Sequence, residues 1–246
     1  MPTVLHDIRT ENGLTASKRQ LWLAFVFPVF TVVALGVDSV FVPVAYFDDR
    51  QIANILAILY FTILFSASGN RLRRLMLVMV PLSYIGELLF CKLLDMYEYR
   101  TPAIPLYVPF GHAIVYASGY IFANTRFAKE SQRAFRRFFA VSFLLLFLSV
   151  GIFLNDMLSV LSGLLFFILL RRKRWQNMYF FIAVCVIFIE LAGTCLKCWV
   201  WDRQVFDAIP TVNPPMGAVF FYAGGDVLLA KITDLWEKKI LTKQTV

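Results

Sequence analysis

The chain has 246 residues, of which 59% are hydrophobic and only 16% charged, and its mean hydropathy is +0.69. Soluble domains contain about 50% apolar and about 25% charged residues, so this composition excludes an ordinary soluble protein. The net charge of +8 is also found in nucleic-acid-binding proteins, but here the basic residues form short clusters between apolar runs. The sequence therefore predicts a membrane protein with no nucleic-acid partner.

Eight apolar runs predict an all-α, polytopic membrane bundle, because a transmembrane helix needs about 20 apolar residues. In chain order the runs are 21–47, 52–67, 75–97, 109–122, 138–154, 157–170, 178–201 and 215–232. The first twenty residues hold no apolar core of a cleavable signal, so we expect the first run to be an uncleaved signal anchor. The runs from 109, 138 and 157 are short, which suits a thinned bilayer or helices that extend into the flanking loops.

Lys and Arg residues predict the orientation, since they resist translocation. Nineteen of the 24 basic residues, including Arg9, Arg172, Arg174 and Lys243, fall on one side of the eight expected crossings. The other five are Arg50, Lys92, Arg100, Lys197 and Arg203. We therefore expect a multi-pass protein of the cytoplasmic (inner) membrane with both termini in the cytoplasm.

A four-helix unit occurs twice in the sequence, at an offset of 105 to 106 residues. In the first copy Lys92 is followed by 103–105 (Ala-Ile-Pro), and in the second Lys197 is followed by 208–210 (Ala-Ile-Pro). An even number of helices per copy predicts a pseudo-twofold axis along the membrane normal, with the third and fourth helices of each copy around a central cavity. The predicted segments are an N-terminal tail (1–20), a first repeat (21–125), a basic linker (126–137), a second repeat (138–232) and a C-terminal tail (233–246).

Two acids, Glu87 and Glu190, lie twelve residues into their apolar runs, which places each about 18 Å into the membrane. Ionisable residues inside a membrane are costly and face the protein interior, so they are functional candidates. Burial at that depth favours a neutral acid that can donate a proton. The alternative interpretation is a pair of structural carboxyl groups that form hydrogen bonds between the repeats.

Asp226 and His112 complete the predicted catalytic set. Asp226 follows two glycines that permit close helix packing, and His112 lies at the start of the fourth helix. Asp38 lies nearer the outer end of the first helix, where solvation is easier, so we rank it below Asp226. The predicted substrate-binding residues are Lys92, Asp95, Tyr116, Thr194, Lys197, Trp201, Asn213 and Tyr222.

The helical spacing around Glu190 predicts a polar stripe, because Thr194, Lys197 and Trp201 follow it at i+4, i+7 and i+11. Cys195 and Cys198 form a CxxC inside the same predicted helix, with no second Cys or His pair to complete a metal site. The chain also lacks GxSxG, HExxH, P-loop and GxGxxG motifs. We therefore expect no metal and no cofactor.

The stretch 190–194 (Glu-Leu-Ala-Gly-Thr), followed by 199–201 (Trp-Val-Trp) and by Ile209-Pro210, resembles membrane proteins of carotenoid biosynthesis. These families are the carotenoid hydratases and the heterodimeric-type lycopene cyclases, and the duplicated unit is also like the fused cyclases. The acidic pair that the cyclases carry after their Pro is replaced here by 106–107 (Leu-Tyr) and 211–212 (Thr-Val). The resemblance implies acid chemistry on a polyene or prenyl chain.

Two hypotheses follow from these features. The first is a cofactor-free enzyme that protonates, hydrates or cyclises a membrane lipid or isoprenoid substrate, with Glu87 and Glu190 as acids. The second is a non-enzymatic module, either a small proton- or cation-coupled transporter or an assembly subunit of a membrane complex. A membrane-protein partner or a homo-oligomer fits either hypothesis.

Overall fold

The computed structural model describes residues 15–42, 49–171, 173 and 175–244, without the side chains of residue 49 and of residues 240–244. Predictions made for the rest lie outside the described residues. They concern the tail up to residue 14 and the side chains of Arg9, Arg172, Arg174 and Lys243.

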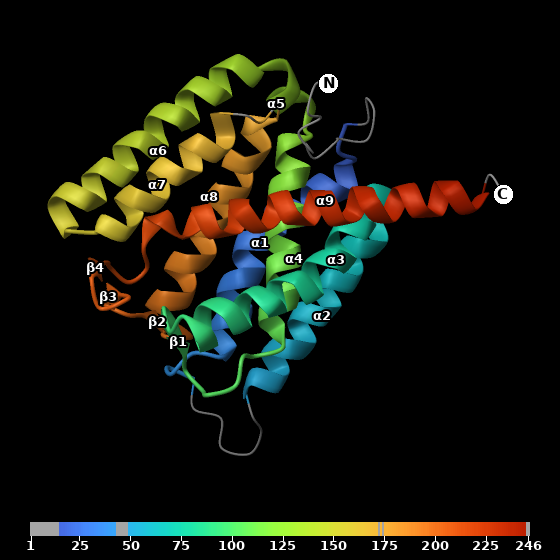
Figure 1. Cartoon of the computed structure of the whole chain (residues 1–246). Coiled ribbons are helices and arrows are strands. Elements are labelled where there is room, and N and C mark those ends of the chain that lie inside the picture. Colours follow the sequence, from blue (N-terminus) through green and yellow to red (C-terminus); the bar gives the residue numbers. More distant parts are fainter. Residues whose placement is uncertain (1–14, 43–48, 172, 174, 245–246) are drawn as a thin grey trace.

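The described part of the chain is dominated by helices that overlap all eight predicted apolar runs (Figure 1). They are α1 (Lys18–Val37), α2 (Asp49–Ala67), α3 (Asn70–Glu87), the π-helix η1 (Leu88–Leu93), α4 (Tyr107–Ala123), α5 (Arg126–Glu130), α6 (Gln132–Leu154), α7 (Met157–Arg171), α8 (Gln176–Cys195), the 3-10 helix η2 (Met216–Ala218) and α9 (Val219–Gln244). The predicted all-α, membrane-type bundle agrees with this architecture.

Six of the helices are long and apolar enough to cross a membrane: α1, α2, α3 with η1, α6, α8 and η2 with α9. The run from 138 belongs to α6, which begins at Gln132 and reaches 23 residues. By contrast, α4 has 17 residues and α7 has 15. α9 continues through the predicted C-terminal tail as far as Gln244.

Two helix ends differ from the sequence-based expectation. α1 begins at Lys18 because Ser17 and Gln20 form a capping box, and it ends at Val37, ten residues before the end of the predicted run. α8 ends at Cys195, and Trp199–Trp201 forms strand β2. The continuous helix predicted to Trp201 was therefore wrong.

Two short antiparallel ribbons connect the helices. β1 (Tyr97–Tyr99) pairs with β2 (Trp199–Trp201), and the register places Glu98 opposite Val200. β3 (Gln204–Val205) pairs with β4 (Ile209–Pro210). The first ribbon joins the chain after α3 to the chain after α8, so it fixes the ends of these two helices side by side.

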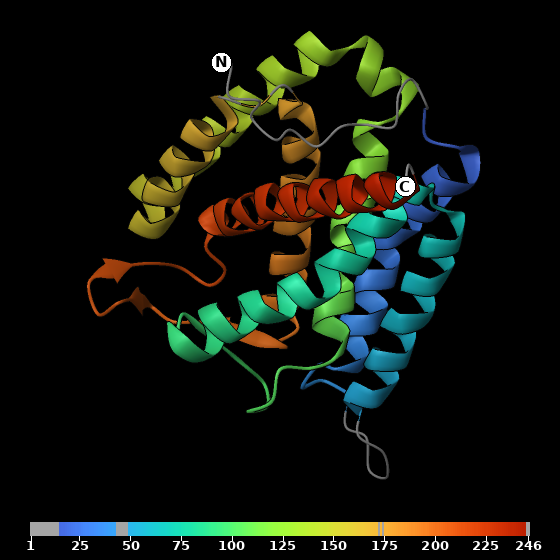
Figure 2. The same cartoon turned by 45° about the vertical axis from the view of Figure 1, so that its right-hand side comes forward.

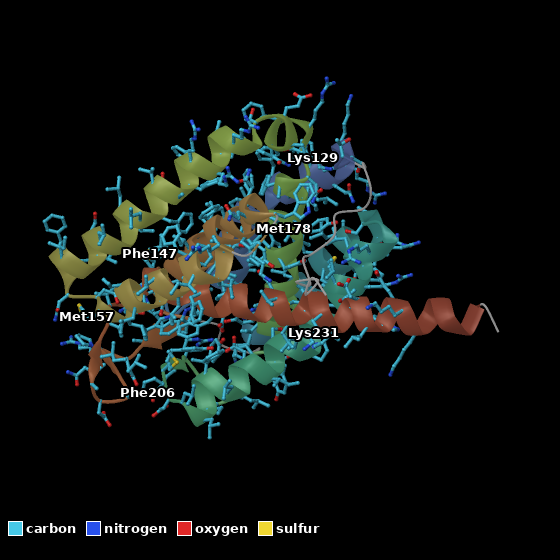
Figure 3. All side chains as sticks on the ribbon, turned by 45° about the horizontal axis from the view of Figure 1, so that its top comes forward. Lys129, Phe147, Met157, Met178, Phe206 and Lys231 are labelled. Carbon is cyan, nitrogen blue, oxygen red and sulfur yellow. The ribbon has the colours of Figure 1, made fainter. Side chains whose placement is uncertain are left out.

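α4 is the central helix of the bundle and packs against α1, α2, α3 and α8. α6 and α7 form an antiparallel pair at one side, where the ring of Phe147 lies against Gly163 (Figure 3). α9 crosses α8 and runs beside α3, as both views show (Figures 1 and 2). The helices α3, α4, α8 and α9 therefore meet in the middle of the molecule.

Candidate functional site

A cavity of about 410 Å³ lies between α3, α4, α8 and α9. Its walls are mainly aliphatic and aromatic, and all four predicted catalytic residues line it: Glu87, His112, Glu190 and Asp226. The three acids are almost completely buried, with exposed fractions of 4%, 5% and 2% in chain order. We call this space the shared cavity, since both halves of the chain line it.

Both carboxyl oxygens of Glu87 take part in hydrogen bonds. Oε2 receives the hydroxyls of Tyr97 and Tyr99, each at 2.7 Å, and Oε1 lies 2.9 Å from Nε2 of His112. Burial, and then the Glu87 carboxylate, raise the pKa of the Tyr99 hydroxyl well above its usual value. Tyr99 therefore keeps the proton that it donates to Glu87.

Glu190 has a matching set of partners. Its Oε2 receives the indole N–H groups of Trp199 at 3.0 Å and Trp201 at 3.1 Å, and its Oε1 accepts the Tyr222 hydroxyl at 3.1 Å. The Tyr222 ring is stacked on His112, with ring centroids 4.8 Å apart. This stack connects the two glutamate clusters across the shared cavity.

The β1–β2 ribbon explains why the two clusters are alike. Alternate residues of a strand point to the same face, so Tyr97 and Tyr99 face one glutamate while Trp199 and Trp201 face the other. The first tyrosine follows its glutamate by ten residues, whereas the first tryptophan follows Glu190 by nine. The π-helical turn η1 accommodates the extra residue in the first half.

The glutamates lie nearer the ribbon than the sequence predicted. Within the spanning helices Asn70–Leu93 and Gln176–Cys195, Glu87 and Glu190 fall about three quarters of the way along. The helices begin before the predicted apolar runs, at Asn70 and Gln176, so each glutamate lies further from its helix start than the twelve residues counted in the sequence. The two glutamates lie at similar positions along their helices.

Asp226 differs from both glutamates. It lines the shared cavity and is 2% exposed, but within the described part of the chain no hydrogen-bond partner reaches its Oδ2. It lies one helical turn after Tyr222 on α9 and directly follows Gly224 and Gly225.

The eight predicted substrate-binding residues have three different locations. Trp201 and Tyr222 line the shared cavity and bind Glu190. Tyr116 and Thr194 are buried but do not line it, and the Thr194 hydroxyl donates to the Glu190 carbonyl of its own helix. The other four, which are exposed and outside the cavity, are Lys92, Asp95, Lys197 and Asn213.

The predicted polar stripe along α8 was wrong, since the helix ends before Lys197. Lys197 has a positive φ and its amino group lies over the ring of Phe41. Asp95 also has a positive φ, and both residues stand two positions before their strands. Counted from the two strands, Lys197 therefore holds the same position as Asp95, whereas the sequence comparison aligned it with Lys92.

Asp38 was expected to be solvated, but it is 1% exposed. Arg100 forms an ion pair with it at 2.6 Å, and the Tyr107 hydroxyl donates to its other oxygen at 2.6 Å. Asp156, at the corresponding connection between α6 and α7, is fully buried and accepts from Thr211 at 3.2 Å. The sequence could not reveal the contacts with Arg100 and Thr211, because these two residues come from distant loops.

The shared cavity has an apolar opening between α3 and α9. Three lining residues, Ile85, Leu89 and Leu228, are at least 40% exposed, so they form its outer rim. Lining residues Gly86, Gly224 and Gly225 have open space where a Cβ atom would lie. At the other end of this helix pair, Arg71 of α3 bonds Asp234 and Glu237 of α9 at 2.9 and 2.7 Å.

The chain was compared with protein families, with curated proteins and with solved structures, and none of the three comparisons gives a match. Among the described residues, no group of three His, Cys, Asp or Glu side chains could hold a metal ion. Functional inference therefore depends on the shared cavity itself.

Proposed function

We propose that the chain crosses the cytoplasmic membrane eight times as a duplicated four-helix unit, with both termini in the cytoplasm. The β1–β2 register supports the duplication, because a twofold axis through Glu98 and Val200 exchanges Tyr97 with Trp199 and Tyr99 with Trp201. Helix packing supports it as well, since α4 packs on α8 and α9 packs on α3. Under that exchange Glu87 and Glu190 occupy equivalent positions.

Reporter fusions test this topology. Fusions after Arg74 and Arg137 should report cytoplasm, and fusions after Thr101 and Asp207 should report the outer side. A single reversal contradicts the eight-crossing arrangement.

Within the shared cavity, the protein acts as a cofactor-free enzyme that hydrates or cyclises an isoprenoid or other lipid alkene by acid catalysis. The observation that carries this proposal is the combination of buried carboxyl groups with aromatic side chains in one apolar cavity. An acid can protonate the alkene, and aromatic faces together with carboxylates stabilise the resulting cation. The apolar rim between α3 and α9 gives a membrane-dissolved chain access from the side.

Turnover tests the enzymatic proposal. Membranes with and without the protein are incubated with two acyclic isoprenoid polyenes, squalene and lycopene, and the extracts are analysed by mass spectrometry. Hydration adds one water to the substrate mass, whereas cyclisation changes retention without changing mass. Unchanged extracts with abundant, inserted protein contradict the enzymatic proposal.

A proton- or cation-coupled transporter is the second candidate. Its specific support is the lining of the shared cavity, which has three acids and, among the described residues, no Lys or Arg. Such a cavity is suited to a cationic solute. Uptake of a lipophilic cation into vesicles, with no change in lipid composition, favours this candidate over the enzyme.

A further inference from the structure

The three buried acids of the shared cavity differ in how their oxygens are used. Both oxygens of Glu87 and both oxygens of Glu190 are engaged in hydrogen bonds with side chains that are fixed by strands or helices. By contrast, Oδ2 of Asp226 is buried and has no partner among the described residues. Leaving a buried polar atom without a partner costs roughly 1 to 3 kcal/mol. Asp226 is also an acid that lines the shared cavity, unlike Thr233, whose hydroxyl is likewise buried without a partner among the described residues.

The cavity lining just before Asp226 on α9 is open. Gly224 and Gly225 precede it in the cavity lining, and a Cβ atom at either position would meet open space. Tyr222 lies one turn earlier on the same helix and is already bonded to Glu190. The lining described above offers Asp226 no Lys or Arg as a counter-ion. A carboxyl group in this position can hold a proton and present it to the cavity.

We propose that Asp226 is the proton donor of the shared cavity, and that Glu87 and Glu190 are positioning residues that hold the surrounding aromatic groups. This inference rests on the proposed function and assigns its acid. The hydrogen bonds explain the division of roles. Asp226 lines the shared cavity and its Oδ2 has no bound donor among the described residues, whereas a substrate would have to displace a bound partner from either glutamate.

Hydration needs water as its only co-reactant, and cyclisation needs none. The alkene π electrons form a new C–H bond with the Asp226 proton, the O–H electron pair remains on the carboxylate, and a carbocation forms at the more substituted carbon. In hydration, water adds to the cation and the excess proton of the resulting oxonium returns to Asp226. In cyclisation, a second double bond of the substrate attacks the cation, and loss of a C–H proton to Asp226 regenerates the acid.

The first test needs no substrate. Dicyclohexylcarbodiimide is an apolar reagent that modifies protonated carboxyl groups, so treatment of membranes followed by peptide mass spectrometry identifies the carboxyl group that holds an accessible proton. We expect modification at Asp226, its loss in Asp226→Asn, and its persistence in Glu87→Gln and Glu190→Gln. Modification of either glutamate in place of Asp226, or of none of the three acids, overturns the inference.

The second test uses the polyene assay at equal membrane abundance. Asp226→Asn should lower turnover at least about 100-fold, the scale of general acid catalysis, and Asp226→Glu should retain part of the activity because it keeps an acid. Glu87→Gln and Glu190→Gln should each lower turnover by about tenfold or less, because a Gln oxygen can still accept from the aromatic donors. Thr233→Val is the matched control, since it removes a buried and unpartnered hydroxyl of α9 outside the cavity.

The outcomes distinguish this inference from the proposed function. Wild-type turnover that survives Asp226→Asn overturns the role of Asp226 and leaves the enzymatic function standing. Absence of wild-type turnover overturns the enzymatic function, and the carbodiimide result then decides the inference alone. In that case modification at Asp226 supports a proton-carrying role for it, and a lack of modification there overturns that role.

Discussion

The two helix pairs that join the halves of the molecule differ in how closely they pack. In the α4–α8 pair, a Cβ atom on Gly119 would lie 2.6 Å from the backbone of Ile182. In the α9–α3 pair, a Cβ atom on Gly225 would meet nothing within 4 Å. Gly119 and Gly225 correspond in the proposed duplication, and a glycine is therefore found at a closed interface in one case and at an open one in the other.

The two helix pairs therefore have different roles, since one stabilises the molecule and the other gives access to the shared cavity. The closed pair, α4–α8, is the most extensive contact between the halves and is surrounded by the main hydrophobic core. The open pair, α3–α9, is joined by ion pairs at one end and forms the apolar rim of the shared cavity at the other. The molecule is therefore closed at one of these helix pairs and open at the other.

The largest predicted effect is the loss of stability when a side chain is added at Gly119. Gly119→Leu forces a side chain into the Ile182 backbone, which cannot move as a flexible side chain would, so we expect destabilisation of about 3 kcal/mol. Thermal unfolding in detergent and membrane abundance measure this loss.

Gly225→Leu is the matched control for that substitution. It should leave the unfolding temperature within a degree or two of wild type, because the space beside it is open. It should also reduce polyene turnover about tenfold by filling the access route. Equal destabilisation by the two leucines would contradict the difference between the interfaces.

The next effect concerns the ion pairs that join α3 and α9 at the end away from the opening of the shared cavity. Arg71→Gln leaves Asp234 and Glu237 with one fewer cation in a partly buried position, and we expect a loss of about 2 kcal/mol. Arg74→Gln is the control, because Arg74 is 34% exposed and makes only one of these ion pairs, at 3.1 Å. It should cost less than about 1 kcal/mol. Similar losses in both variants would argue against Arg71 as the residue that joins the helices.

A smaller effect compares the two glutamate clusters. Tyr97→Phe removes one of three donors to Glu87, and Tyr222→Phe removes one of three donors to Glu190. Each should lower stability by about 1 kcal/mol, because the remaining two donors still solvate the carboxyl group. Tyr84→Phe on the exposed side of α3 should change nothing measurable. A much larger loss of stability in one of these two variants would show that the two glutamate clusters contribute unequally to stability.

The sequence predicted the helical framework and the acids of the site for clear physical reasons. Runs of apolar residues locate helices in a membrane protein, and buried charges stand out within them. The eight apolar runs therefore predicted the positions of the helices. The ionisable residues inside these runs identified Glu87, Glu190 and Asp226. The predicted catalytic residue His112 also lines the shared cavity.

The same signal failed where an apolar segment is not a helix. Trp199–Trp201 continues an apolar run, so periodicity did not separate it from α8, and the strand pairing with Tyr97–Tyr99 depends on a contact across about a hundred residues. Polar residues near the helix ends, such as Lys92 and Asn213, were assigned to the site by proximity in sequence. In the structure Lys92 lies on the π-helix η1 and Asn213 in the loop after β4, and both are exposed.

The smallest predicted effect lies at the end of the β1–β2 ribbon and depends on pH. Partial burial, and then the negative charges of Asp95, Glu98 and Asp207, raise the pKa of Asp202 above its usual value of 3.8. The ionised form of Asp202 is therefore less favourable in the folded chain than in the unfolded chain. Its contribution to stability is greatest at low pH and is lost as the pH rises through the raised pKa.

Asp202→Asn removes this titration. The variant should be more stable than wild type at neutral pH by less than about 0.5 kcal/mol, since solvent screens a partly exposed group, and the difference should vanish below the usual pKa of an aspartate. Thermal unfolding of both proteins across the acid range measures it. Asp95→Asn should give part of the same gain by removing one of the repelling charges, whereas the second half has Lys197 at the corresponding turn. A constant difference between wild type and Asp202→Asn at every pH would assign the effect to packing and not to charge.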